Sequence, residues 1–113
     1  MINIKVHYNN VEEISSFVVS GHANSGPYGQ DLVCAAVSAV TFGAVNAVLE
    51  ITNAPLHIEQ GGEGGYLKID IPTNLSQDIK EKVELLFQGM LISLKTIERD
   101  YEEYVSIHKA KGR

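Results

Sequence analysis

The sequence predicts an α+β fold in one domain that spans residues 1–113, with the element order β-β-α-β-β-α-β. Alternating apolar and polar residues indicate strands in two successive pairs, each joined by a turn-forming segment. A long apolar run after the first pair indicates one helix, and apolar residues at steps of three and four after the second pair indicate another. Because a sheet must cover its apolar face, we expect both helices to pack together against one small β-sheet.

The amino-terminal strands are expected at residues 2–8 and 14–20. Apolar residues alternate in the first strand, an Asn-Asn pair supplies turn chemistry, and the second strand is rich in β-branched and apolar residues. The segment 21–30 combines Gly21, Gly26 and Gly29 with a proline among small polar residues. That composition predicts a mobile loop.

The first helix is predicted to have Asp31 as its N-cap and to run from residue 32 to residue 51. Polar and small residues interrupt its apolar composition, which favours a buried helix of a soluble protein over a membrane span. The segment 53–55 ends the helix, because Pro55 disfavours helix before it. Three small residues on one side of the helix would let another backbone approach closely: Ala36, Gly43 and Ala47.

The second half of the chain repeats the hairpin-then-helix order. Residues 56–59 and 66–71 alternate around a glycine-rich segment, which predicts a hairpin with one buried face. An amphipathic helix is predicted from the apolar pattern at 79–101, with Asn74 and Gln77 as its cap. A last short strand is expected at 104–107, followed by a frayed basic tail at 109–113.

Charge and cysteine content narrow the function classes. Nine basic against fourteen acidic residues give a net charge of −5, which predicts a basic or neutral partner and no direct contact with nucleic acid. The amino terminus alternates like a strand and does not resemble a secretion signal, so no membrane partner is expected. With one cysteine the chain cannot form an internal disulfide, which favours a reducing cytoplasm.

The segment 21–38 holds the residues that predict chemistry. Cys34 falls in the first turn of the predicted helix, where free N–H groups and the positive end of the helix dipole favour thiolate. His22 stands twelve residues earlier at the end of a strand, from which it could act as the base for that thiol. The same N–H groups could stabilise the oxyanion formed when sulfur attacks an amide.

Supporting roles in this segment stay open. Ser38 shares a helix face with Cys34 and Thr41, so its hydroxyl could lie near the sulfur or orient His22. Asp31 could cap the helix, orient His22 or do both, although its charge near the sulfur would disfavour thiolate.

Structural interpretations compete with each of these features. A lone cysteine in a small protein is most often buried and unreactive. The glycine loop lacks the Lys-Ser/Thr ending of a phosphate-binding P-loop. His7, His57 and His108 stand isolated in predicted strands, so no metal site or other cofactor is predicted.

The segments Gly21-His22-Ala23 and Asp31–Ser38, with Gly26 and Gly29 between them, resemble the Prp family of ribosomal-processing cysteine proteases. The resemblance extends over nearly the whole chain, including residues 42–47 and 90–98. It implies a homodimeric bacterial enzyme without a cofactor that uses a His22–Cys34 dyad. The implied substrate is the precursor of large-subunit ribosomal protein number twenty-seven, whose amino-terminal extension is removed after a pair of aromatic residues. The glycine-rich loop is expected to order around this substrate.

Two other function classes remain open at this stage. A noncatalytic ribosome-assembly or ribosome-binding protein would also be small and without a cofactor motif, and Cys34 would then be core packing. A redox-sensing thiol is the weaker alternative, because it would need an intermolecular disulfide.

Overall fold

The computed structural model describes residues 1–21, 28–61 and 65–111, with side chains described for 1–21, 32–61 and 65–110. Its element order is the predicted β-β-α-β-β-α-β, so the predicted fold class is confirmed. The strands are β1 Ile2–Tyr8, β2 Ile14–Ser20, β3 His57–Gln60, β4 Tyr66–Asp70 and β5 Val105–Lys111, and the helices are α1 Tyr28–Thr52 and α2 Gln77–Asp100.

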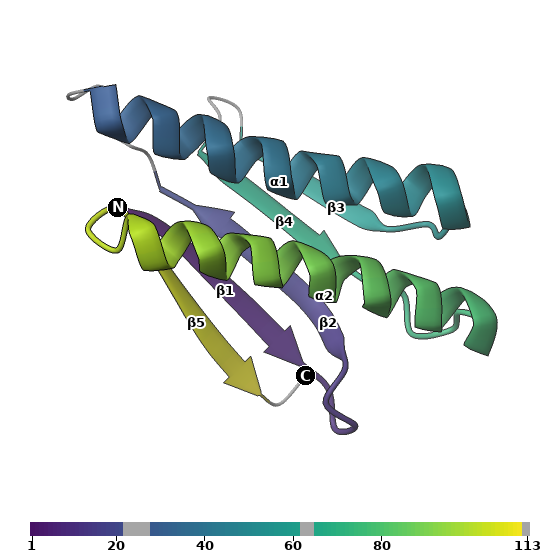
Figure 1. Cartoon of the computed structure of the whole chain (residues 1–113). Coiled ribbons are helices and arrows are strands. Elements are labelled where there is room, and N and C mark those ends of the chain that lie inside the picture. Colours follow the sequence, from purple (N-terminus) through teal and green to yellow (C-terminus); the bar gives the residue numbers. More distant parts are fainter. Residues whose placement is uncertain (22–27, 62–64, 112–113) are drawn as a thin grey trace.

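The five strands form one sheet in the order β3-β4-β2-β1-β5. Neighbouring strands run antiparallel except β1 and β5, which are parallel. Figure 1 shows both helices side by side over one face of the sheet, α1 above β3 and β4 and α2 above β2 and β1. The two layers place the amino-terminal half of α1 near the end of β2, the end of β3 and the start of β4.

The core fills the space between the helix pair and the sheet. Alternate residues of β1 are buried, as its sequence pattern predicts. Phe17 of β2 and Phe87 of α2 are both fully buried, with ring centroids 5.1 Å apart in an edge-to-face arrangement. Such a contact joins a central strand to the second helix and sets the distance between the two layers.

Helix α1 begins at Tyr28, four residues before the predicted start, so the prediction that Asp31 caps it is wrong. Asp31 is instead the fourth residue of the helix, and Gly29, which was expected in the loop, is the second. Acidic residues are favoured both as caps and within the first turn, because the helix N-terminus carries partial positive charge. The sequence signal is therefore the same in the two positions.

The end of α1 follows the prediction more closely. The helix ends at Thr52, and Asn53 takes φ 57° while its N–H donates to Leu49 O at 3.1 Å. Asparagine tolerates this left-handed conformation, which closes the helix before Pro55. Within the described residues no backbone approaches the small-residue side of α1 at Gly43, where an added Cβ would meet no atom within 4 Å.

Helix α2 is capped by Ser76, and the predicted cap at Asn74 and Gln77 is wrong. The Ser76 hydroxyl accepts a hydrogen bond from Ile79 N at 3.4 Å, while Gln77 is the first helical residue. Sequence patterns locate helix ends only to within a residue or two, so a polar residue two positions away competes for the same role.

Two strands also differ from expectation. All four residues of β3 are exposed, so the predicted buried face of the second hairpin exists on β4 alone. Edge position explains this, because β3 has β4 on one side only. Residues 109–111 are not a tail but the last part of β5, which pairs with β1 as far as Tyr8.

The stretch Leu32–Thr52 of α1 is long and apolar enough to cross a membrane, judged by length and composition only. Only 28% of this apolar stretch is buried by the described residues of the chain. The expected buried helix is thus buried along one stripe, and much of its apolar surface is left uncovered by the described part of the chain.

Candidate active site

A cavity of about 180 Å³ lies between the amino-terminal half of α1 and the strand ends beneath it. Its wall is mostly apolar, with a thiol, three hydroxyl groups and an amide as its side-chain polar groups. The lining residues come from every strand except β5 and from α1: Ile2, Val19, Gly21, Cys34, Val37, Ser38, Thr41, Phe42, Gln60, Gly65, Tyr66 and Leu67.

Cys34 lines this cavity and is half-buried. It packs against the hydrophobic core on one side and faces the cavity on the other. The thiol is therefore neither sealed in the interior nor fully solvated, which meets the first requirement for a nucleophile.

Cys34 is the seventh residue of α1 and lies in its second turn, so the prediction that it occupies the first turn is wrong. Only the first four N–H groups of an α-helix have no partner within the helix, and the effect of the dipole falls off within the first turn. Six residues of helical rise separate Cys34 from Tyr28, about 9 Å. The helix start alone cannot supply the activation or the oxyanion contacts that the sequence suggested, so a base and other donors are needed.

The predicted shared face of Cys34, Ser38 and Thr41 is confirmed, since all three line the cavity. The Thr41 hydroxyl donates to Val37 O at 2.8 Å, which satisfies a side chain that is only 1% exposed. Ser38 is exposed and stands one turn after Cys34. Ser38 is therefore the accessible hydroxyl next to the sulfur on this face.

Gly21 ends the β2 side of the cavity in a conformation that requires glycine. Its φ is +99°, its N–H donates to Gly65 O at 2.9 Å, and a Cβ there would lie 2.2 Å from Met1 O. The backbone is thus fixed at the residue that directly precedes His22.

The remaining predicted residues can be placed only in part. His22, Gly26 and the side chain of Asp31 lie outside the described part of the chain, so the dyad and the supporting roles stay predictions. His7, His57 and His108 stand in strands as expected. Within 1–21, 28–61 and 65–111, no three histidine, cysteine or acidic side chains gather as metal ligands would.

Sequence reasoning missed the wall opposite the cysteine, which is formed by Gln60, Gly65 and Tyr66. These residues reach the site because β4 pairs with β2 and brings Ser20 opposite Tyr66. The glycine-rich segment was the one available signal, and it predicted a turn without saying what the turn would lie against.

A half-buried thiol in the wall of an apolar cavity, on a rigid helix of an α+β domain, is the arrangement of a small cysteine-dependent enzyme. A family model for cysteine protease Prp matches residues 1–106. The ribosomal processing cysteine protease Prp of Bacillus subtilis is 42% identical over 107 residues, covering 95% of this chain and 96% of that protein. The chain therefore belongs to the cysteine protease Prp family.

Solved structures agree with this assignment. Prp from Staphylococcus aureus with a covalently linked product peptide superposes with a TM-score of 0.84 at 34% identity, covering 96% of this chain and 99% of that one. The same S. aureus protein with a substrate peptide gives a TM-score of 0.84 at 33% identity with the same coverage. The resemblance inferred from the motif residues and the α+β fold are both confirmed.

Proposed function

We propose that the chain is a cysteine endopeptidase that removes the amino-terminal extension of large-subunit ribosomal protein number twenty-seven during ribosome biogenesis. Family membership supports the reaction class, and the observation that carries the proposal is Cys34 in the wall of a cavity large enough for a side chain. The S. aureus relative holds a covalently linked product peptide, which is what a covalent mechanism predicts.

His22 is proposed to accept the proton of the Cys34 thiol as sulfur attacks the scissile carbonyl. The C–N bond then breaks, the imidazolium returns the proton to the departing amine, and the extension stays on sulfur as a thioester. Water, activated by the same imidazole, hydrolyses the thioester and restores the thiol. Because Cys34 lies past the free amides of the helix start, His22 carries most of the activation, with Asp31 or Ser38 in a supporting role.

The segment between β2 and α1 is proposed to cover the bound substrate. It starts at Gly21, which lines the cavity and whose backbone is held by Gly65. A net charge of −5 suits a basic ribosomal protein as substrate, because opposite charges speed the encounter of the two molecules.

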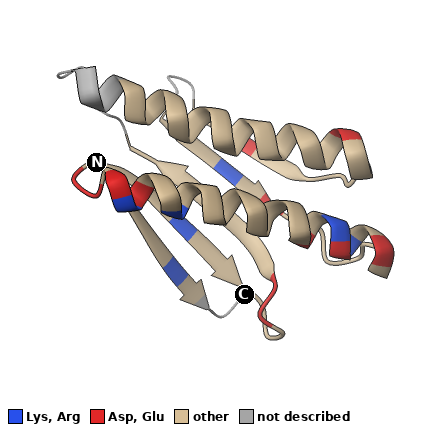
Figure 2. Ribbon diagram, viewed as in Figure 1, with Lys and Arg blue, Asp and Glu red and all other residues tan. Residues whose placement is uncertain are grey.

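We further propose that the enzyme works as a homodimer in the cytoplasm. The lone cysteine must stay reduced to react, which suits a reducing compartment. Figure 2 shows that the middle of α1 is free of charged residues, and in the sequence no charged residue occurs between Asp31 and Glu50. Leu32 is 66% exposed on this helix, and Gly43 is exposed with nothing packed against it, so the outer side of α1 is the surface proposed to meet its copy.

Incubation of the precursor ribosomal protein with the enzyme, followed by mass spectrometry, tests the proposal. Wild type should release the extension, while Cys34→Ala and His22→Ala should lose cleavage by a factor of at least about a thousand and keep wild-type thermal unfolding. The matched control is Ser93→Ala, an exposed hydroxyl on α2, which should cleave normally. Undiminished cleavage by Cys34→Ala would rule out Cys34 as the nucleophile, whereas no cleavage by wild type would favour a noncatalytic binding protein.

A further inference from the structure

Strand β3 forms one edge of the sheet, and its backbone directions follow from the hydrogen bonds around it. Gly61 N donates to Tyr66 O at 3.0 Å, so residue 61 faces β4. In an antiparallel pair successive residues point their N–H and C=O groups alternately to either side. Glu59 and His57, two and four residues earlier, therefore face β4, and Ile58 and Gln60 face outwards.

The partner strand gives the same result independently. On β4, Gly65 O accepts from Gly21 N and Ile71 N donates to Ser15 O, so the odd-numbered residues of this stretch face β2. Its even-numbered residues then face β3, opposite Glu59 and His57 in the register. The outward direction of the Ile58 and Gln60 backbone thus rests on three observed hydrogen bonds.

The outward side of β3 is continuous with the cavity that holds Cys34. Gln60, the last residue of β3, lines the cavity together with Phe42 of α1. Ile58 projects on the same side of the sheet as Gln60, because it pairs with the buried Ile69 as Gln60 does with Leu67. Phe42 is 39% exposed and Ile58 37% exposed, so apolar side chains accompany the free backbone groups up to the thiol.

Strand β5 forms the opposite edge of the sheet, and there two outward N–H groups are hydrogen-bonded within the chain. On β5 the outward Ile107 N donates to the Glu98 carboxylate at 2.8 Å, and Val105 N donates to Tyr101 O at 3.2 Å. Natural proteins cover edge strands in this way to prevent pairing with other chains. In the described part of the chain β3 has no comparable cover.

We propose that an extended segment of the peptide substrate adds to the sheet as a strand beside β3 and pairs with the backbone of Ile58 and Gln60. This inference rests on the proposed protease function and says how its substrate is held. Strand addition gives affinity through main-chain hydrogen bonds, and every second side chain of the added strand faces the helix layer. Such a side chain would lie next to Phe42 and enter the cavity. The scissile bond of the same peptide would then lie close to the Cys34 thiol.

A series of synthetic precursor peptides, each N-methylated at one residue, tests this pairing. A paired N–H that is replaced by N-CH₃ loses its hydrogen bond and blocks approach of the strand, so kcat/KM should fall by about ten-fold or more. The losses should recur at every second residue of the bound segment, with smaller effects between. A loss that is uniform or confined to the scissile residue overturns the proposal.

Proline substitution tests the protein side. Ile58→Pro removes an outward N–H without removing a β3–β4 hydrogen bond, which edge strands tolerate. Its matched control is Lys109→Pro on β5, whose N–H also faces away from the neighbouring strand by the same alternation from Ile107. We expect Ile58→Pro to raise KM about ten-fold for the precursor peptide, and Lys109→Pro to leave cleavage unchanged.

Two readouts keep the outcomes distinct. Alkylation of Cys34 by iodoacetamide should proceed at the wild-type rate in Ile58→Pro, because a small reagent does not need the added strand. Equal effects of the two proline variants, or slower alkylation in Ile58→Pro alone, overturn the strand-pairing proposal. If wild type does not cleave the unmodified peptide at all, the protease function itself fails, independently of β3.

Discussion

Gly21 directly follows β2 at the cavity, and its backbone is held in a conformation that favours glycine. Its positive φ costs a side-chain-bearing residue about 1–2 kcal/mol, and the contact of a Cβ with Met1 O adds to this. We therefore expect Gly21→Ala to lower the free energy of unfolding in urea by more than about 2 kcal/mol. Because Gly21 precedes His22, cleavage should fall as well.

The control for this prediction is Gly89→Ala. Gly89 is exposed on α2 and a Cβ there would meet nothing within 4 Å, so alanine should raise the free energy of unfolding by about 0.5–1 kcal/mol. Equal stability of the Gly21→Ala variant and wild type would contradict the left-handed geometry at the cavity.

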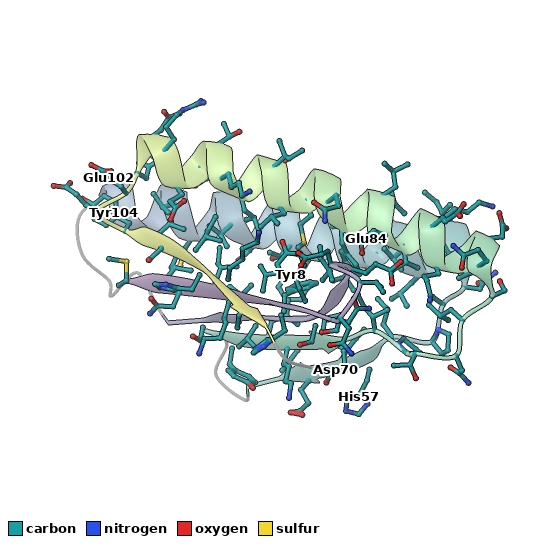
Figure 3. The ribbon with its side chains drawn as sticks, turned by 90° about the horizontal axis from the view of Figure 1, so that it is seen from below. Tyr8, His57, Asp70, Glu84, Glu102 and Tyr104 are labelled. Atoms are coloured by element: carbon teal, nitrogen blue, oxygen red, sulfur yellow. The ribbon has the colours of Figure 1, made fainter. Side chains whose placement is uncertain are left out.

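Tyr8 is expected to make the free energy of unfolding depend on pH in the alkaline range. Burial raises the pKa of Tyr8 above its usual value of 10.0, and the nearby carboxylates of Glu84 and Glu12 raise it further. Figure 3 shows Tyr8 on the helix side of β1 and Glu84 on α2 above it. Above pH 10 the unfolded chain loses the phenol proton while the folded chain keeps it, so the free energy of unfolding falls as pH rises.

Tyr8→Phe should remove this part of the pH dependence. In urea unfolding between pH 8 and pH 11, the stability of wild type relative to Tyr8→Phe should decline by up to about 1.4 kcal/mol per pH unit above the unfolded pKa. Tyr101→Phe, which changes a tyrosine that is 46% exposed, is the control for removal of a hydroxyl. Parallel curves for wild type and Tyr8→Phe would show that Tyr8 titrates alike in both states.

The relative positions of site residues could be predicted from sequence where the residues lie on the same helix. Helical spacing correctly put Cys34, Ser38 and Thr41 on one face, because that relation depends on α1 alone. The Gln60 and Tyr66 side of the cavity depends on which strands pair, and no local pattern contains that information.

At the scale of elements, α2 offers a direct test of a corrected boundary. Ser76 accepts a hydrogen bond from Ile79 N, so Ser76→Ala should lower the free energy of unfolding by about 1 kcal/mol. Asn74→Ala is the matched control, since Asn74 was the cap expected from sequence, and it should change stability by less than about 0.5 kcal/mol. A larger effect at Asn74 than at Ser76 would restore the earlier assignment.

Element boundaries were less predictable than the elements themselves, and α1 shows why. Acidic residues serve both as caps and within first turns, so Asp31 could not distinguish a start at residue 28 from one at residue 32. This difference of four residues moves Cys34 out of the first turn. In the proposed mechanism, activation of the thiol is therefore assigned to His22 and not to the helix start.

For the whole molecule, the order of elements and the two-layer architecture followed from patterning, because each helix and strand carries its own period. The strand order β3-β4-β2-β1-β5 did not, since pairing β5 beside β1 joins residues about a hundred positions apart. That pairing also explains why residues 109–111 looked like a tail: their partner is at the other end of the sequence.

The exposed apolar side of α1 predicts the behaviour of the whole molecule in solution. Size-exclusion chromatography with light scattering should give twice the mass of the 113-residue chain. Gly43→Arg should give the mass of a single chain, because a charged side chain would stand where the copies meet. Val11→Arg, in the exposed turn between β1 and β2, is the control and should stay dimeric. A single-chain mass for wild type, or a dimeric Gly43→Arg, would contradict this surface.

The proposed mechanism requires Cys34 to form a covalent bond to the extension during cleavage. Acid quenching of the enzyme during turnover of its precursor, followed by intact-mass and peptide-mapping mass spectrometry, tests it most directly. We expect a transient mass increase equal to the extension minus water, located on the peptide that contains Cys34. Cleavage that continues in Cys34→Ala, with no adduct on wild type at any time, would contradict it.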